Sequence, residues 1–155
     1  MAEFTPEQRP KVLHQCGRDR AQELFARYRE LDIEADVREF IDDMAAAYYQ
    51  ADLVVCRAGA MTVAEICAAG LAAVLVPYPY AAGNHQHINA QYLVSQGAAI
   101  ALEESELSAN LLARTVKKFQ DDRARLLSIA QKARALGRPD AIGRVTGQCL
   151  EVVSA

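Results

Sequence analysis

The 155-residue sequence lacks the cysteine pattern of a disulfide-stabilised or zinc-binding protein. Its four cysteines, Cys16, Cys56, Cys67 and Cys149, lie far apart in the chain. We expect at least three of them to belong to buried elements. This distribution is typical of reduced structural thiols in a cytosolic protein.

Long apolar runs and an excess of one charge are also missing. No segment is long and apolar enough to span a bilayer, and the N-terminus has no apolar run of the kind found in signal peptides. Any contact with a membrane would therefore be peripheral. The formal net charge is −3, and basic residues are scattered along the chain, which argues against a nucleic-acid partner.

What the sequence does contain is a regular alternation of strand and helix patterns. We expect residues 1–10 to form an irregular lead-in and residues 11–155 to form one domain with a sizeable core. Strands are predicted at 11–16, 35–40, 53–56, 73–76 and 98–102, and helices at 19–31, 44–50, 61–69, 87–96, 108–119, 122–136 and after Asp140. The last helix carries an apolar stripe of Ile142, Val145, Cys149 and Val152. This order predicts an α/β fold with a parallel sheet covered by helices on both faces.

The stretch 52–89 is the centre of this pattern. A buried strand, 53–56, is followed by a turn at Gly59, a helix, and a second buried strand that ends at Pro77. The turn opens a helix N-terminus, whose unpaired amides and dipole favour an anionic group such as phosphate. A polar loop, 78–87, follows the second strand at the same edge of the sheet, where open α/β sheets bind ligands.

The run Thr62-Val63-Ala64-Glu65 allows two interpretations. The first is a capping box, in which Thr62 and Glu65 satisfy each other's backbone amides. The second is that Glu65 accepts hydrogen bonds from vicinal sugar hydroxyls, as acidic residues do for ribose in many nucleotide-binding folds. The spacing alone favours the capping box.

The run Asn84-His85-Gln86-His87 gathers hydrogen-bonding side chains at a helix start. A metal site would need a third ligand, and only His14 remains, so we expect no metal. His85 could act as a general base, but no nearby residues complete a recognisable triad. Asn84 as a simple N-cap is the structural alternative to a neutral site that binds sugar hydroxyls and amides.

Two further signals lie at strand ends. Arg57 follows the strand at 53–56 and could bind phosphate, although an exposed arginine is the commoner outcome. Ile41 and Asp42 follow the strand at 35–40, so their backbone could face a base.

Taken together, these segments resemble one family. The runs FIDDMAAAY (40–48), ADLVVCRAGAMTVAEICAAG (51–70) and VPYPYAAGNHQHINA (76–90) are similar to the MurG family of bacterial N-acetylglucosaminyltransferases, and share the pattern RxGAxTVxEI. The similarity runs from about Lys11 to the C-terminus and covers the family's donor-binding, C-terminal half.

The resemblance implies a biochemical role. It implies a Rossmann-like domain of a GT-B glycosyltransferase that binds UDP-N-acetylglucosamine, in an enzyme that adds the sugar to lipid I to make lipid II in peptidoglycan synthesis. Cell wall biogenesis, cell shape and cell division would depend on that product. No cofactor and no metal are implied.

The resemblance also implies roles for single residues in binding uridine diphosphate. Glu65 would hold the uridine ribose, and Ile41 would meet uracil through its backbone. Ala60, Met61 and Thr62 would present the helix N-terminus to the diphosphate. His85 and Gln86 would read the hydroxyls of N-acetylglucosamine, although some family members have glutamine where His85 stands.

Parts of the family pattern have no match in this chain. The N-terminal domain, which binds lipid I and the inner face of the cell membrane and carries the proposed base, is missing, and so is the first strand of the donor domain. We therefore expect a fragment or one half of a split enzyme, cytoplasmic and inactive alone. A non-catalytic nucleotide-sugar-binding subunit and a UDP-N-acetylglucosamine epimerase-like fragment remain alternatives. Without the first strand, we expect strand 11–16 either to pair with strand 53–56 or to leave a slot filled by another segment or chain.

Overall fold

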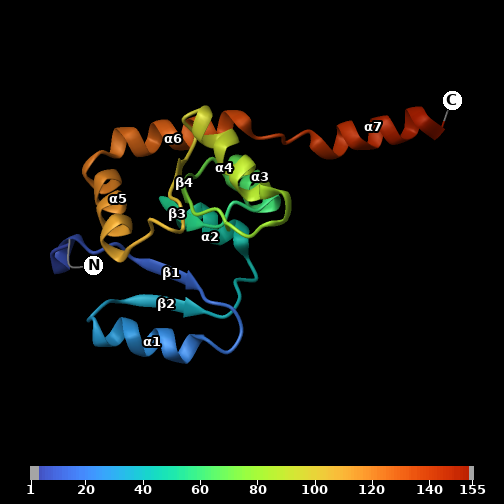
Figure 1. Ribbon diagram of the computed structural model, residues 1–155. Helices are drawn as coiled ribbons and strands as arrows, with labels where there is room; N and C mark the ends of the chain where they lie inside the picture. Colours follow the sequence, from blue (N-terminus) through green and yellow to red (C-terminus); the bar gives the residue numbers. More distant parts are fainter. Residues whose placement is uncertain (1–3, 154–155) are drawn as a thin grey trace. The chain divides into compact units, whose positions relative to one another are not determined.

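The computed structural model describes residues 4–153 (Figure 1). Its strands are β1 (Val12–Gln15), β2 (Ala35–Arg38), β3 (Leu53–Cys56), β4 (Ala72–Leu75) and β5 (Ile100–Ala101). Its helices are α1 (Ala21–Glu30), α2 (Met44–Gln50), α3 (Ala60–Ala69), α4 (His85–Ser95), α5 (Ala109–Asp121), α6 (Arg123–Leu136) and α7 (Ala141–Val153). Two 3-10 turns, η1 (Pro6–Gln8) and η2 (Ala82–Asn84), complete the list.

All strand pairs in the described chain are parallel, and the predicted α/β, Rossmann-like class is confirmed. The strands form two sheets, one of order β1-β2 and one of order β3-β4-β5. The expected pairing of strand 11–16 with strand 53–56 is therefore wrong. β1 pairs with β2 and β3 pairs with β4, each in register over its whole length. Filling of the slot by another chain stays a prediction.

The chain divides into two compact units, which are described separately. The first comprises residues 1–50 and 108–118, and the second residues 51–107 and 119–155. In the first unit, α1 packs on β2, and the His14 Nδ1 atom lies 3.0 Å from the Tyr28 hydroxyl. The sequence offers Asp42 or Asp43 as the cap of α2, and it is the Asp43 carboxylate that accepts a 2.8 Å hydrogen bond from the Ala46 amide.

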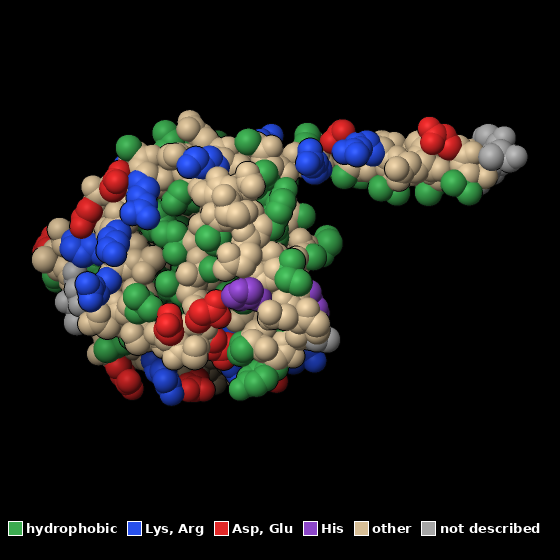
Figure 2. Space-filling model, turned by 45° about the horizontal axis from the view of Figure 1, so that its top comes forward, with side chains coloured by type: hydrophobic (Ala, Val, Ile, Leu, Met, Phe, Trp, Pro, Cys, Tyr) green, Lys and Arg blue, Asp and Glu red, His purple; other side chains and the backbone are tan. Residues whose placement is uncertain are grey.

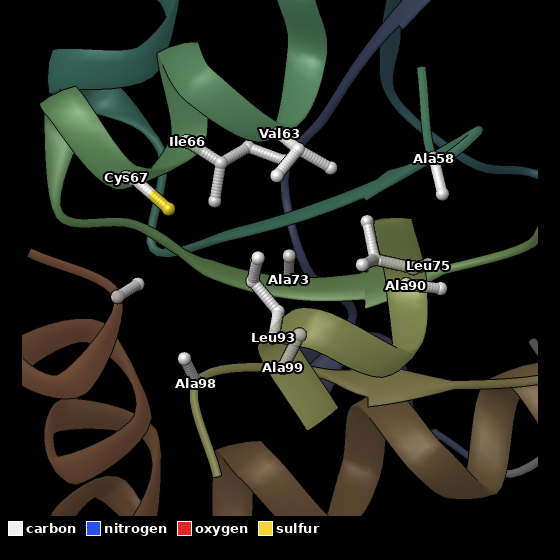
Figure 3. Packing of buried hydrophobic residues seen from close by; sticks show 11 residues of the cluster. Ala58, Val63, Ile66, Cys67, Ala73, Leu75, Ala90, Leu93, Ala98 and Ala99 are labelled. Atoms are coloured by element: carbon white, nitrogen blue, oxygen red, sulfur yellow. The ribbon is translucent and has the colours of Figure 1, made fainter. Parts of the chain in front are cut away.

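The core of the second unit is built around β4, whose residues are all buried. Figure 3 shows Val63, Ile66 and Cys67 of α3 directed toward this strand, with Leu93 of α4 close to Ala73. Ile66, Leu75 and Leu93 are fully buried. The continuous apolar run predicted for a central parallel strand is thus confirmed in β4.

Helix α6 packs on α3 and β4. The Asp122 carboxylate caps α6 by accepting a 2.9 Å hydrogen bond from the Arg125 amide. Near the other end of α6, the Arg134 guanidinium donates to the Ala68 carbonyl in the last turn of α3. A cation at this helix end is electrostatically favourable. Helix α3 then ends at Gly70, which adopts the left-handed conformation at φ 68°.

The apolar stripe predicted for the last helix is present on α7 and is exposed. Ile142 is 83% exposed, Val145 61% and Val152 80%, and Cys149 is exposed as well. Hydrophobic side chains follow one side of α7 in Figure 2. The helical period predicted from the sequence is confirmed, whereas burial of such a stripe depends on a neighbouring element.

The four cysteines are free thiols in this structure. Cys67 is buried, Cys16 and Cys56 are half-buried and Cys149 is exposed, so fewer are buried than the sequence suggested. Within residues 4–153, no helix has the length and apolar character needed to cross a membrane.

Candidate functional site

The carboxyl ends of the three strands of the second unit meet at one edge. Cys56 at the end of β3 is paired with Leu75 at the end of β4, and Leu75 is paired with Ala101 at the end of β5. The segments that follow these strands therefore leave the sheet side by side. They hold most of the polar residues singled out from the sequence.

The first segment leads into α3. Ala58 is fully buried, Gly59 is the N-cap residue, and the first intrahelical bond joins the Val63 amide to the Gly59 carbonyl at 2.9 Å. The amides of Ala60, Met61 and Thr62 precede that bond, at the positive end of the helix dipole. An anion would be stabilised at this end of α3.

The capping-box interpretation of Thr62 and Glu65 is wrong. Helix α3 begins at Ala60, its cap is Gly59, and no side chain supplies a capping hydrogen bond. Thr62 is thus the third residue of the helix, already inside its first turn. Glu65 lies one turn further on and is exposed.

The second segment follows β4 and is closed by a hydrogen bond between its two ends. The Tyr78 amide donates to Oε1 of Gln86 at 2.9 Å. Between them, Gly83 and Asn84 adopt left-handed backbone conformations with φ 62° and 56°. Gln86 is thereby fixed with its oxygen toward the loop, so its side-chain NH₂ group is the part free to donate elsewhere.

His85 and Asn84 stand at the start of α4. His85 is exposed and is the first residue of the helix, two positions before the helix start predicted from the sequence. Asn84 takes the N-cap position as predicted, but its side chain makes no capping hydrogen bond. The helical spacing of Ile88, Tyr92 and Leu93 predicts that all three face inward. Leu93 is buried, but Ile88 and Tyr92 are 61% and 48% exposed.

Arg57 is held by its own surroundings. Its guanidinium donates to the carbonyls of Val76 and Pro77 at 3.3 and 3.4 Å and forms an ion pair with Glu104. It also lies 5.4 Å from the centre of the Tyr78 ring. Arg57 thus contacts both the loop after β4 and the segment after β5, and its suggested binding of phosphate stays a prediction.

Neighbouring groups add two further features. His87 Nδ1 lies 3.3 Å from a carboxylate oxygen of Glu103. Burial raises the pKa of the Cys56 thiol, at the end of β3, to about 11, so the thiol is protonated at neutral pH. No cluster of three or more metal-ligating side chains occurs in the part of the chain that the structure describes.

No role was predicted for Asn89, which joins two segments of the site. Its side-chain amide donates a 3.0 Å hydrogen bond to the carbonyl of Ala58, just before α3. An asparagine on a helix four positions after His85, at helical spacing from it, was the available signal. Its acceptor lies 31 residues away and could not be read from the sequence.

Ile41 belongs to the first compact unit and is described by itself. It is buried, with 7% of its surface exposed, and its amide donates to Oε1 of Gln15 at 3.0 Å. Its amide is therefore already bonded. Its carbonyl is the backbone group that could accept a hydrogen bond from a base.

A family model and several known proteins match most of this chain. The profile of the glycosyltransferase family 28 C-terminal domain matches residues 1–145. A protein of Nitrosococcus oceani is 52% identical over 94% of this chain and 41% of its own length, and one of Marinobacter nauticus is 49% identical over 94% and 40%. Both are named UDP-N-acetylglucosamine–N-acetylmuramyl-(pentapeptide) pyrophosphoryl-undecaprenol N-acetylglucosamine transferase.

A solved structure is similar as well. The crystal structure of Acinetobacter baumannii MurG superposes with a TM-score of 0.86 at 37% identity, over 94% of this chain and 42% of that one. The chain thus spans about two fifths of the length of the proteins it matches.

Proposed function

The chain belongs to the glycosyltransferase family 28 C-terminal domains, and from this membership we propose a donor-binding role. In this proposal the chain is the donor-binding half of a transferase that moves N-acetylglucosamine from UDP-N-acetylglucosamine to lipid I. The observation that carries the proposal is the position of the α3 N-terminus. It follows Gly59 and lies at the carboxyl ends of β3, β4 and β5. Such an edge is where open parallel sheets bind ligands.

In this proposal the residues of α3 bind uridine diphosphate. The amides of Ala60, Met61 and Thr62 donate to the diphosphate, whose negative charge grows as the sugar leaves. Fixed amide dipoles aimed at that charge stabilise it without a metal. Glu65 accepts hydrogen bonds from the ribose hydroxyls, and the carbonyl of Ile41 accepts from the uracil N3–H.

The N-acetylglucosamine moiety is assigned to the loop after β4. Gln86 is oriented by Tyr78, so it would donate through its NH₂ group to a sugar hydroxyl, while exposed His85 offers a second polar contact. In the same proposal, residues 11–155 form one UDP-sugar-binding domain. Lipid I and the inner face of the cell membrane are bound by an N-terminal domain.

Isothermal titration of the chain with UDP and UDP-N-acetylglucosamine tests the proposal. We expect one site for each ligand, with tighter binding of UDP than of uridine because the diphosphate supplies the charge-assisted bonds. We also expect no disaccharide when the chain is incubated with UDP-N-acetylglucosamine and a lipid I analogue, because general-base catalysis of the transfer needs a group on the acceptor side. Absence of UDP binding would contradict the donor-binding role. Turnover by the purified chain would contradict the proposal that a separate domain supplies the acceptor site and the general base.

A further inference from the structure

Three consecutive crossover segments of the second unit are joined by one side chain. Arg57 follows β3, the carbonyls of Val76 and Pro77 follow β4, and Glu104 follows β5. The Arg57 guanidinium bonds to all three partners. Val76 and Pro77 are themselves buried, so the root of the loop after β4 is fixed at the same place.

The same loop is closed a few residues later. Arg57 lies against the ring of Tyr78, and the Tyr78 amide donates to Gln86 at 2.9 Å. The contacts of Arg57 and the contact of Gln86 therefore meet at Tyr78. A displacement of the Arg57 side chain would therefore reach Gln86 through Tyr78.

We propose that Glu104 is a positioning residue, which acts through Arg57 to hold the loop 76–87 in the conformation that binds the donor sugar. The inference rests on the donor-binding function proposed above. The Glu104 side chain pairs with Arg57, which is not among the residues assigned to the donor. Its carboxylate fixes the guanidinium, the guanidinium fixes Val76, Pro77 and Tyr78, and Tyr78 orients Gln86.

The physical basis is geometrical more than electrostatic. The side chains of Arg57 and Glu104 are 48% and 37% exposed, so solvent screens much of their attraction. The planar guanidinium, however, binds several acceptors in a fixed arrangement. Loss of one acceptor increases the number of conformations open to the loop. The apparent affinity of a ligand falls in proportion to the fraction of chains that hold the competent conformation.

Three variants test the inference. Glu104→Ala removes the acceptor, Glu104→Gln keeps an acceptor oxygen without the charge, and Glu106→Ala is the matched control because it removes an exposed carboxylate from the same segment. Hydrogen exchange of the ligand-free chain reports on the loop. Titrations with UDP and with UDP-N-acetylglucosamine report on the two parts of the donor.

In Glu104→Ala we expect amides of 76–87 to exchange at least about threefold faster, and the Kd of UDP-N-acetylglucosamine to rise by about three- to tenfold, while that of UDP changes less than about twofold. Glu104→Gln is expected to fall between Glu104→Ala and the wild type, and Glu106→Ala to match the wild type. If Glu104→Ala does not fold, Glu104→Gln decides the matter through the same measurements.

Unchanged exchange in the loop, or an equal loss of affinity for both ligands, would overturn the inference. If the wild-type chain binds neither ligand, the proposed function fails and the assignment to the sugar fails with it. The exchange measurement needs no ligand and is independent of that result. It therefore distinguishes failure of the Glu104–Arg57 pair to hold the loop from failure of the donor site.

Discussion

The side-chain amide of Asn89 donates a 3.0 Å hydrogen bond to the backbone carbonyl of Ala58, and so ties helix α4 to the turn that opens α3. Ala58 is fully buried. A buried carbonyl needs a partner, and here a side chain 31 residues away supplies it. The position of the α3 N-terminus therefore depends on α4.

Replacement of Asn89 by alanine should weaken both the fold and the site. The buried carbonyl of Ala58 would lose its partner, at a cost of about 1–3 kcal/mol in the free energy of unfolding. UDP affinity should fall as well, because the turn before Ala60 loses its anchor. Thermal unfolding and titration with UDP measure the two effects. Gln91→Ala, on an exposed position of the same helix, is the control and should change neither; equal effects of both substitutions would contradict the role of Asn89.

Gly137 and Gly143 differ in the space available for a side chain, so substitutions at the two positions can be compared. A Cβ atom added to Gly137 would lie 3.0 Å from the Cys67 carbonyl oxygen and 3.1 Å from that of Arg134, whereas nothing lies within 4 Å of the corresponding position at Gly143. Gly137→Ala should therefore destabilise the chain by about 1–3 kcal/mol in urea unfolding. Gly143→Ala, inside α7, should be neutral or stabilise by up to about 1 kcal/mol. A Gly137→Ala variant as stable as the wild type would show that α6 does not approach α3 this closely.

The local pattern of the sequence predicted most elements of the fold. β3 matches its predicted bounds, and α3 begins one residue before the predicted start, because apolar period and glycine positions are local signals. The predicted helix at 44–50 has the observed bounds of α2 for the same reason. The division into two sheets could not be predicted, because it depends on pairing between segments far apart in the chain.

The candidate site was harder to predict than the fold. Arg57 was identified as a strand-end residue, but its partner Glu104 lies 47 residues away. Thr62 was given a capping role because its spacing to Glu65 fits a capping box, yet the helix starts two residues earlier. Ile88 and Tyr92 were predicted to face inward from their helical spacing, yet both are exposed. Each error comes from tertiary context that spacing does not contain.

The Cys56 thiol gives the second unit a pH dependence. Burial raises the pKa of this thiol from 9.0 to about 11 in the folded chain. Between these pH values the folded chain holds a proton that the unfolded chain has lost, so the free energy of unfolding decreases as the pH rises. The decrease due to Cys56 is about 2–3 kcal/mol, at 1.36 kcal/mol per pKa unit.

Comparison with Cys56→Ala isolates this contribution, since all other titrating groups are shared. The stability difference between wild type and Cys56→Ala, measured by urea unfolding, should be constant up to about pH 8.5 and should shift against the wild type as the pH rises toward 11. A difference that does not change over this range would show that the Cys56 thiol ionises as readily in the folded chain as in the unfolded one.

Glu65 should act on the ribose. Glu65→Ala is expected to weaken UDP binding by about 1.5–3 kcal/mol, the range for hydrogen bonds to a charged group. The variant should no longer distinguish UDP from 2′-deoxy-UDP, because the hydroxyl that separates them has lost its acceptor. Glu106→Ala, which removes an exposed carboxylate elsewhere, should keep the distinction. Unchanged UDP affinity in Glu65→Ala would remove Glu65 from the site.

The central claim is that the N-terminus of α3 binds the diphosphate of a uridine nucleotide, and amide NMR of the ¹⁵N-labelled chain tests it most directly. Titration with UDP should shift the backbone amide resonances of Ala60, Met61 and Thr62 toward those of hydrogen-bonded amides, and uridine alone should leave them in place. Saturable UDP binding with these three resonances unchanged would contradict the account.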